Sequence, residues 1–139
     1  MKMIFLVLIL VTVASPLFAK EEIIFTGIPE MKISEGATSR VAESLSKSRA
    51  MEYKCTITKI DETYYWRTRE NVELIMISRG RFITFWAVEG QGYIRIVNPE
   101  MRKTARKIGA MLHDPEGYFD YVEHLLLGLK SVTYYGNSR

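Results

Sequence analysis

The chain has 139 residues, a length that suits one domain and excludes two domains with separate cores. Apolar residues make up 47% of the chain and charged residues 25%, a balance that excludes a disordered or fibrous protein. The formal net charge of +3 is modest and by itself favours no class of partner.

The first 19 residues predict a secretory signal peptide. Lys2 supplies a positive charge, an apolar run follows as far as Val13, and small residues precede Ala19. The run is shorter than the roughly 20 residues that span a membrane, so the mature chain is expected to have no transmembrane helix. We predict cleavage near Ala19 and a periplasmic or secreted protein, for which nucleic acid is not an expected partner. An uncleaved anchor is the alternative.

Residues 20–50 have the least regular pattern. EEIIFTGIPE favours a short strand that ends at Gly27 and Pro29, whereas the residues after it carry only a sparse apolar stripe. A frayed helix and a mobile arm both fit this stretch. The predicted organisation is therefore a signal peptide at 1–19, an N-terminal arm at 20–50 whose order is left open, and a single α+β domain at 51–139.

From Tyr53 to Val97 the pattern indicates strands. Five runs rich in aromatic and β-branched residues alternate with brief polar or glycine-containing turns; they are YKCTITKI, TYYWRTR, VELIMIS, FITFWAV and GYIRIV. Such spacing predicts consecutive hairpins and an antiparallel meander. The third and fourth runs are apolar on both sides, as in central strands that are covered on both faces. The N-terminal arm, curvature toward a barrel, and another subunit are three alternative covers for the far face.

Two helices are expected after the sheet. Asn98-Pro99-Glu100 and Asp114-Pro115-Glu116 each combine a capping side chain, a proline suited to the first helical position, and an acid that favours the positive end of the helix dipole. An apolar stripe at helical spacing follows each start. The final SVTYYG predicts one more short strand. The predicted fold class is α+β: an antiparallel β-meander of about five strands followed by two C-terminal helices packed on one face.

Cys55 is the only cysteine, so a disulfide within the chain is excluded. It falls on an alternating apolar face, which favours burial over a role as a nucleophile. A constellation of Cys55, His113 and Asp114 or Asp120 contains the residue types of thiol catalysis, but nothing in the sequence brings them together. No catalytic motif is present. We therefore predict no catalytic residues.

Glu116, Asp120 and His124 recur at four-residue spacing in the second predicted helix. This spacing allows neighbouring side chains to converge on a metal, but it is also typical of an ordinary exposed helix face. One histidine and two carboxylates without a metal-binding motif are a weak site. No metal and no cofactor are therefore predicted.

The stretch TYYWRTRE, read as a strand, sends alternate side chains to opposite faces. Tyr64 and Trp66 are expected in the core. The other face would carry an aromatic ring and two arginines, and the fifth run adds an arginine beside Tyr93. The predicted ligand-binding residues are Tyr65, Arg67, Arg69 and Arg95.

These four residues combine guanidinium groups with an aromatic ring, a pattern that suits carboxylate, phosphate or sugar acid groups. The alternative is cross-strand pairing of the arginines with Glu70, Glu73 or Glu89, which is the more common arrangement at a protein surface.

A second basic surface is predicted on the first helix, opposite its apolar stripe. Its residues are Arg102, Lys103, Arg106 and Lys107. A cationic helix face can rest on an anionic membrane surface or a phosphate-rich polymer. A merely solvated face is the alternative, which we favour because the apolar stripe is needed for the core.

The predicted function is a small, exported, non-enzymatic binding or interaction protein. Its expected partner is an anionic component of the cell envelope or another protein. Two alternatives remain open from the sequence: a small envelope hydrolase, and a structural subunit of an envelope complex. A shared architecture does not discriminate among them, because one fold supports many functions.

Overall fold

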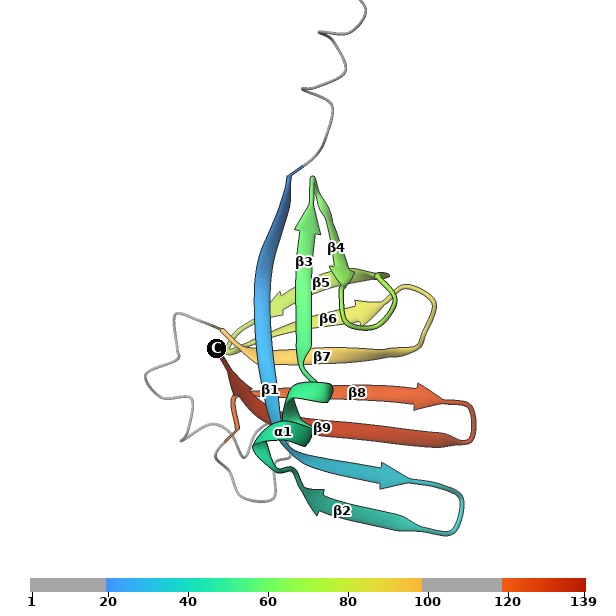
Figure 1. Cartoon of the computed structure of the whole chain (residues 1–139). Helices are drawn as coiled ribbons and strands as arrows, with labels where there is room; N and C mark the ends of the chain where they lie inside the picture. Colours follow the sequence, from blue (N-terminus) through green and yellow to red (C-terminus); the bar gives the residue numbers. More distant parts are fainter. Residues whose placement is uncertain (1–19, 99–118) are drawn as a thin grey trace, which may run out of the picture.

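The computed structural model describes residues 20–98 and 119–139, to which every structural statement below applies (Figure 1). They form nine strands: β1 (Glu21–Glu35), β2 (Arg40–Ser44), β3 (Cys55–Ile60), β4 (Thr63–Trp66), β5 (Val72–Arg79), β6 (Phe82–Ala87), β7 (Gly92–Val97), β8 (Tyr121–Leu127) and β9 (Lys130–Ser138). One helix, α1 (Lys47–Glu52), lies between β2 and β3. Ser46 caps this helix, since its hydroxyl accepts a hydrogen bond from the backbone N–H of Arg49 at 3.4 Å.

Eight of these strands close into an antiparallel barrel. Each strand from β3 to β8 pairs with the next one along the chain, and β9 pairs in turn with β1. The long strand β1 makes this closure possible, because Glu21–Gly27 pairs with β3 and Gly27–Glu35 pairs with β9. The remaining strand, β2, forms a hairpin with the second half of β1. In Figure 1 this hairpin lies at the bottom of the view, with β2 outermost.

The predicted α+β class with two C-terminal helices is wrong, because the described chain is almost entirely β. The described part of the second predicted helix, residues 119–129, contains strand β8 instead of a helix. The start of this predicted helix at Asp114 and the whole first predicted helix lie outside the described residues. The apolar residues Tyr121 and Leu125 suit a helical stripe, but they also point to one face of a strand, where side chains alternate.

The predicted antiparallel sheet is confirmed. The five runs between Tyr53 and Val97 correspond to β3 through β7, and the final run is strand β9. Strand β1 is longer than expected, because it continues past Pro29. Proline is tolerated there because the pairing with β9 shifts register between Pro29 and Met31, which is where an irregularity can accommodate the missing N–H.

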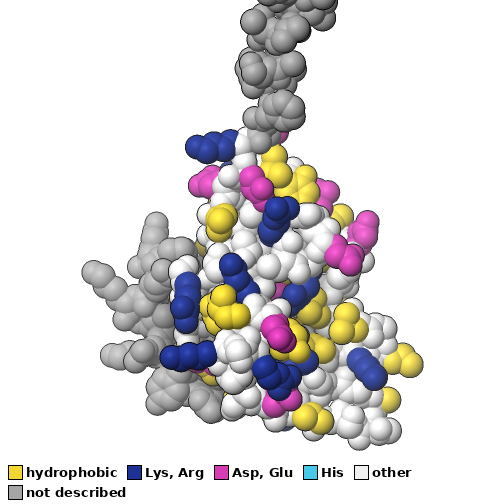
Figure 2. All heavy atoms as spheres, viewed as in Figure 1, with side chains coloured by type: hydrophobic (Ala, Val, Ile, Leu, Met, Phe, Trp, Pro, Cys, Tyr) yellow, Lys and Arg dark blue, Asp and Glu magenta, His cyan; other side chains and the backbone are white. Residues whose placement is uncertain are grey.

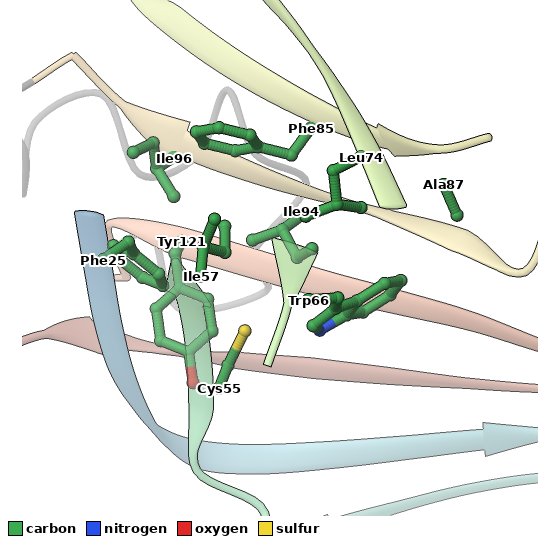
Figure 3. Packing of buried hydrophobic residues seen from close by; sticks show 10 residues of the cluster. All are labelled: Phe25, Cys55, Ile57, Trp66, Leu74, Phe85, Ala87, Ile94, Ile96 and Tyr121. Atoms are coloured by element: carbon green, nitrogen blue, oxygen red, sulfur yellow. The ribbon is translucent and has the colours of Figure 1, made fainter. Parts of the chain in front are cut away.

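The barrel interior is packed with side chains from seven of its strands (Figure 3). Ile57, Trp66, Phe85 and Ile94 are almost completely buried, and Tyr64 packs against them. Cys55 is fully buried, as predicted. An eight-stranded barrel is either just filled by side chains or holds one small ligand, so its ends decide whether a ligand has room.

The outer face also carries a packed cluster, formed by Ile33, Val97, Phe119, Val122 and Tyr135. The sequence left three alternatives for covering the far face of the sheet: the N-terminal arm, curvature toward a barrel, and another subunit. The structure shows curvature into a barrel. It leaves part of that face open, since Ile75 on β5 stays 54% exposed. No helix among the described residues has the length and apolar character needed to cross a membrane.

Candidate functional site

Three turns lie together at one end of the barrel, on the right-hand side of Figure 1. They are residues 67–71 between β4 and β5, 88–91 between β6 and β7, and 128–129 between β8 and β9. An up-and-down barrel brings every second connection to the same end, because successive strands run in opposite directions. We call this end the mouth.

Arg69 points into the mouth because β4 ends at Trp66. The backbone then turns, with Glu70 and Asn71 in the left-handed region at φ values of 57° and 56°. Arg69 therefore does not continue the alternation of the strand. Its Nη2 lies 2.6 Å from Oε1 of Glu123 on β8, and the side chains of Arg69 and Glu123 are 23% and 0% exposed.

Glu123 has a second partner inside the barrel. Its Oε2 accepts a hydrogen bond of 2.7 Å from the indole Nε1–H of Trp66. Burial raises the pKa of Glu123 above its ordinary value, although the Arg69 guanidinium and the hydrogen bonds favour the charged form. The Arg69 guanidinium also lies 5.7 Å from the ring centroid of Tyr134. The arginine is thus held by a carboxylate and an aromatic face.

A pocket of about 380 Å³ opens at the mouth, beside this pair. It is lined by Trp66, Thr68, Arg69, Glu70, Val72, Gln91, Leu125, Leu126 and Leu127. Its volume lies within the range of about 300–1,000 Å³ typical of small-molecule sites. Leu126 and Leu127 are 52% and 57% exposed, so the wall they form is apolar and reaches solvent. Apolar side chains appear at the surface on the same side in Figure 2.

Two polar atoms in the wall of the mouth pocket are buried without a hydrogen-bond partner among the described residues. They are Nε of Arg69, a donor, and Oε1 of Gln91, an acceptor. The amide nitrogen of Gln91 is already used, since it donates to Glu89 at 3.0 Å. Because an unpaired buried polar atom costs about 1–3 kcal/mol, a ligand group that pairs with both atoms gains that energy on binding.

The structure does not bring the four predicted ligand-binding residues together. Tyr65 lies on the outer face of β4, opposite Thr58 on β3 and Glu73 on β5. Arg67 is exposed, and its Nε lies 3.4 Å from Oε1 of Glu21. The expectation that Tyr65, Arg67 and Arg69 share one strand face is wrong, because the strand ends at Trp66.

Arg95 is on the outer face of β7, where its Nε donates to the hydroxyl of Thr84 at 3.3 Å. The observed carboxylate partners of Arg67 and Arg69 are Glu21 and Glu123, not the three glutamates considered from the sequence. Ligand binding by each of the four residues stays a prediction. The predicted basic face at Arg102, Lys103, Arg106 and Lys107 lies outside the described residues.

The other candidate residues have structural partners where they are described. Asp120 accepts two hydrogen bonds of 2.7 Å from Ser138, and Nδ1 of His124 lies 2.9 Å from the Thr133 hydroxyl. No cluster of three metal-ligating side chains occurs in the two described ranges. Burial raises the pKa of the Cys55 thiol, whereas a nucleophilic thiol needs a lowered pKa.

Sequence reasoning missed Glu123 and the three leucines of the mouth because it placed residues 114–129 in a helix, and it missed Gln91 because it assigned that residue only to a turn. The sequence held no clear signal for Glu123, because this charged residue lies between Tyr121 and Leu125 on the inward face and interrupts the apolar alternation of YVEHLLL. Comparisons with models of known protein families, with curated proteins and with solved structures give no match.

Proposed function

We propose that the protein is a non-enzymatic binding protein that takes a small, mostly apolar molecule with an uncharged polar head into the mouth pocket. One observation carries this proposal: the unpaired donor of Arg69 and the unpaired acceptor of Gln91 belong to side chains that line the same leucine-walled pocket. A few placed polar groups in a mainly apolar wall are the usual composition of a small-molecule site.

The electrostatics of the pocket favour an uncharged head. The charge of Arg69 is already balanced by Glu123, and Glu70 adds a further carboxylate to the lining. An anionic head would add negative charge beside these acids, and a cationic head would meet the arginine at close range. A head that accepts one hydrogen bond and donates another, such as a primary amide or an alcohol, matches both unpaired atoms.

The predicted export of the protein supports a ligand found outside the cytoplasm, and this location is part of the proposal. The hydrolase alternative gains no support from Cys55, because its thiol is buried and its pKa is raised. The anionic partner expected from the sequence is not favoured at the mouth.

Calorimetric titration with octanamide, which carries an apolar chain and an amide head, tests the proposal. We expect saturable binding and weaker binding of octanoate, whose head is charged at neutral pH. Replacing the acceptor by Gln91→Leu should weaken octanamide binding by about tenfold, the equivalent of one lost hydrogen bond.

Two leucines of the β8–β9 hairpin provide a matched control. Leu127 lines the pocket, whereas Leu129 is 92% exposed and does not. Leu127→Ser should therefore weaken octanamide binding, and Leu129→Ser should leave it unchanged. No binding by the wild-type protein, or equal loss in both variants, would contradict the proposal.

A further inference from the structure

A second concave surface lies on the outside of the barrel, away from the mouth. Its six lining residues are Ile77, Arg79, Phe82, Thr84, Trp86 and Arg95, and its volume is about 420 Å³. We call it the outer groove. Its floor follows from the register of β5, β6 and β7, which places Ile77, Thr84 and Arg95 directly opposite one another on the outer face.

The apolar part of the outer groove is exposed to solvent. Trp86 is 42% exposed and Ile77 40% exposed. The Trp86 ring packs against Tyr93, with ring centroids 5.0 Å apart, and Tyr93 stacks on His124 at 5.3 Å. The aromatic row fixes the indole from one side and leaves part of it accessible, as a stacking platform requires.

The polar part of the outer groove is cationic. The Arg95 guanidinium is oriented by its hydrogen bond to Thr84 and by the ring of Tyr93, whose centroid is 5.6 Å away. Among the described residues, neither Arg79 nor Arg95 has an ion-pair partner within 4.0 Å, and no acidic side chain lines the groove. The two positive charges are therefore not balanced locally.

We propose that the outer groove binds a small anion with a flat apolar body, such as an aromatic carboxylate. The carboxylate would accept hydrogen bonds from the guanidinium forks of Arg95 and Arg79, and the flat body would cover Trp86. Charge complementarity defines the head, and the exposed indole beside Ile77 defines the body. This binding site is independent of the mouth, which favours an uncharged head.

Nuclear magnetic resonance with 2-naphthoate as the probe separates the two sites in one spectrum. The chain has two tryptophans, and each indole N–H gives a signal: Trp66 reports on the mouth and Trp86 on the outer groove. We expect 2-naphthoate to shift the Trp86 signal in a saturable way and to leave Trp66 unchanged. The neutral analogue 2-naphthamide should bind the groove at least about tenfold more weakly, because it lacks the charge-assisted hydrogen bonds.

Arginine substitutions locate the anion. Arg95→Gln and Arg79→Gln should each weaken 2-naphthoate binding by about tenfold, the effect of one lost hydrogen bond to a charged group. Arg67→Gln is the matched control, because Arg67 is an exposed arginine outside the groove, and it should bind as the wild type does. An unchanged Trp66 signal in each variant verifies that the barrel interior is intact.

Three results would overturn the proposal. The first is a shift of Trp66 without a shift of Trp86, and the second is wild-type affinity in both groove variants. The third comes from vesicles of phosphatidylglycerol mixed with phosphatidylcholine: if they perturb Trp86 and 2-naphthoate does not, the surface recognises a membrane and not a small anion.

Discussion

Arg69 and Glu123 are 54 positions apart in the sequence, yet their side chains meet at 2.6 Å inside the barrel. The pair joins the turn after β4 to the middle of β8. Glu123 is completely buried and Arg69 is partly exposed. Removal of one partner therefore has a different effect on stability from removal of the other. Loss of the arginine leaves a buried carboxylate without its cation, whereas loss of the glutamate leaves a guanidinium that can still reach water.

Arg69→Met is therefore expected to lower the free energy of unfolding by about 3–5 kcal/mol at pH 7, and Glu123→Gln by less. In Arg69→Met the pKa of Glu123 rises further, so the variant loses stability as pH rises above the ordinary glutamate value of about 4.3. Urea denaturation at pH 4 and pH 7 measures both effects. Arg40→Met, which removes an exposed ion pair with Glu35, is the control and should cost less than about 1 kcal/mol.

The indole of Trp66 is expected to stabilise the same carboxylate. Trp66→Phe keeps an aromatic ring but removes the donor to Glu123, which should lower the free energy of unfolding by about 1–3 kcal/mol in addition to the loss of packing. Trp86→Phe, at the outer groove, should change the free energy of unfolding by about 0.5 kcal/mol or less. Equal effects of the two substitutions in chemical denaturation would show that the hydrogen bond is unimportant.

Gly92 at the start of β7 is expected to tolerate no side chain. Its φ is +151°, and an added Cβ would overlap the carbonyl oxygen of His124 on β8. Gly92→Ala should cost about 3–5 kcal/mol, because backbone strain and overlap with a fixed backbone atom add together. Gly90 also has a positive φ, of +85°, but open space around it, so Gly90→Ala should cost only about 1–2 kcal/mol. Thermal unfolding of the two variants tests the difference.

His124 is expected to titrate below its ordinary pKa of about 6.5, because burial disfavours the charged ring. A lowered native pKa means that the unfolded chain binds more protons. The stabilising contribution of the neutral His124 ring is therefore present above pH 6.5, and it is lost as the pH falls from 6.5 through the native pKa of His124. A proton titration followed by nuclear magnetic resonance in the His113→Gln variant, which retains one histidine, measures this pKa. A value above 6.5 would contradict the expected effect of burial.

The strands β3 to β7 could be predicted because their sequences alternate and their turns contain glycine or acidic residues. Strand β8 could not be predicted from its sequence. Its inward side chains are Tyr121, Glu123 and Leu125, and the charged residue in the middle interrupts the apolar alternation. Glu123 is buried only because Arg69 and Trp66 reach it from elsewhere in the barrel. A pattern confined to one segment contains no information about such distant partners.

Strand β1 was predicted too short for a similar reason. Gly27 and Pro29 commonly end a strand, but here Gly27 is where β1 changes its pairing from β3 to β9. Of the mouth residues, the sequence analysis singled out Arg69, whose role in ligand binding stays a prediction, but placed it on a strand surface. The pocket depends on two turns and the end of β8, which meet only in the closed barrel.

The pairing of β1 with both β3 and β9 imposes an order on folding. Gly27 lies opposite Ser138, so the first described strand cannot complete its hydrogen bonds until the last described strand has been synthesised. Contacts between such distant residues require the closure of a long loop, which favours slow folding. During synthesis, the second half of β1 presents an open edge to which a neighbouring chain can add. Removal of β9 would make that aggregation-prone state permanent.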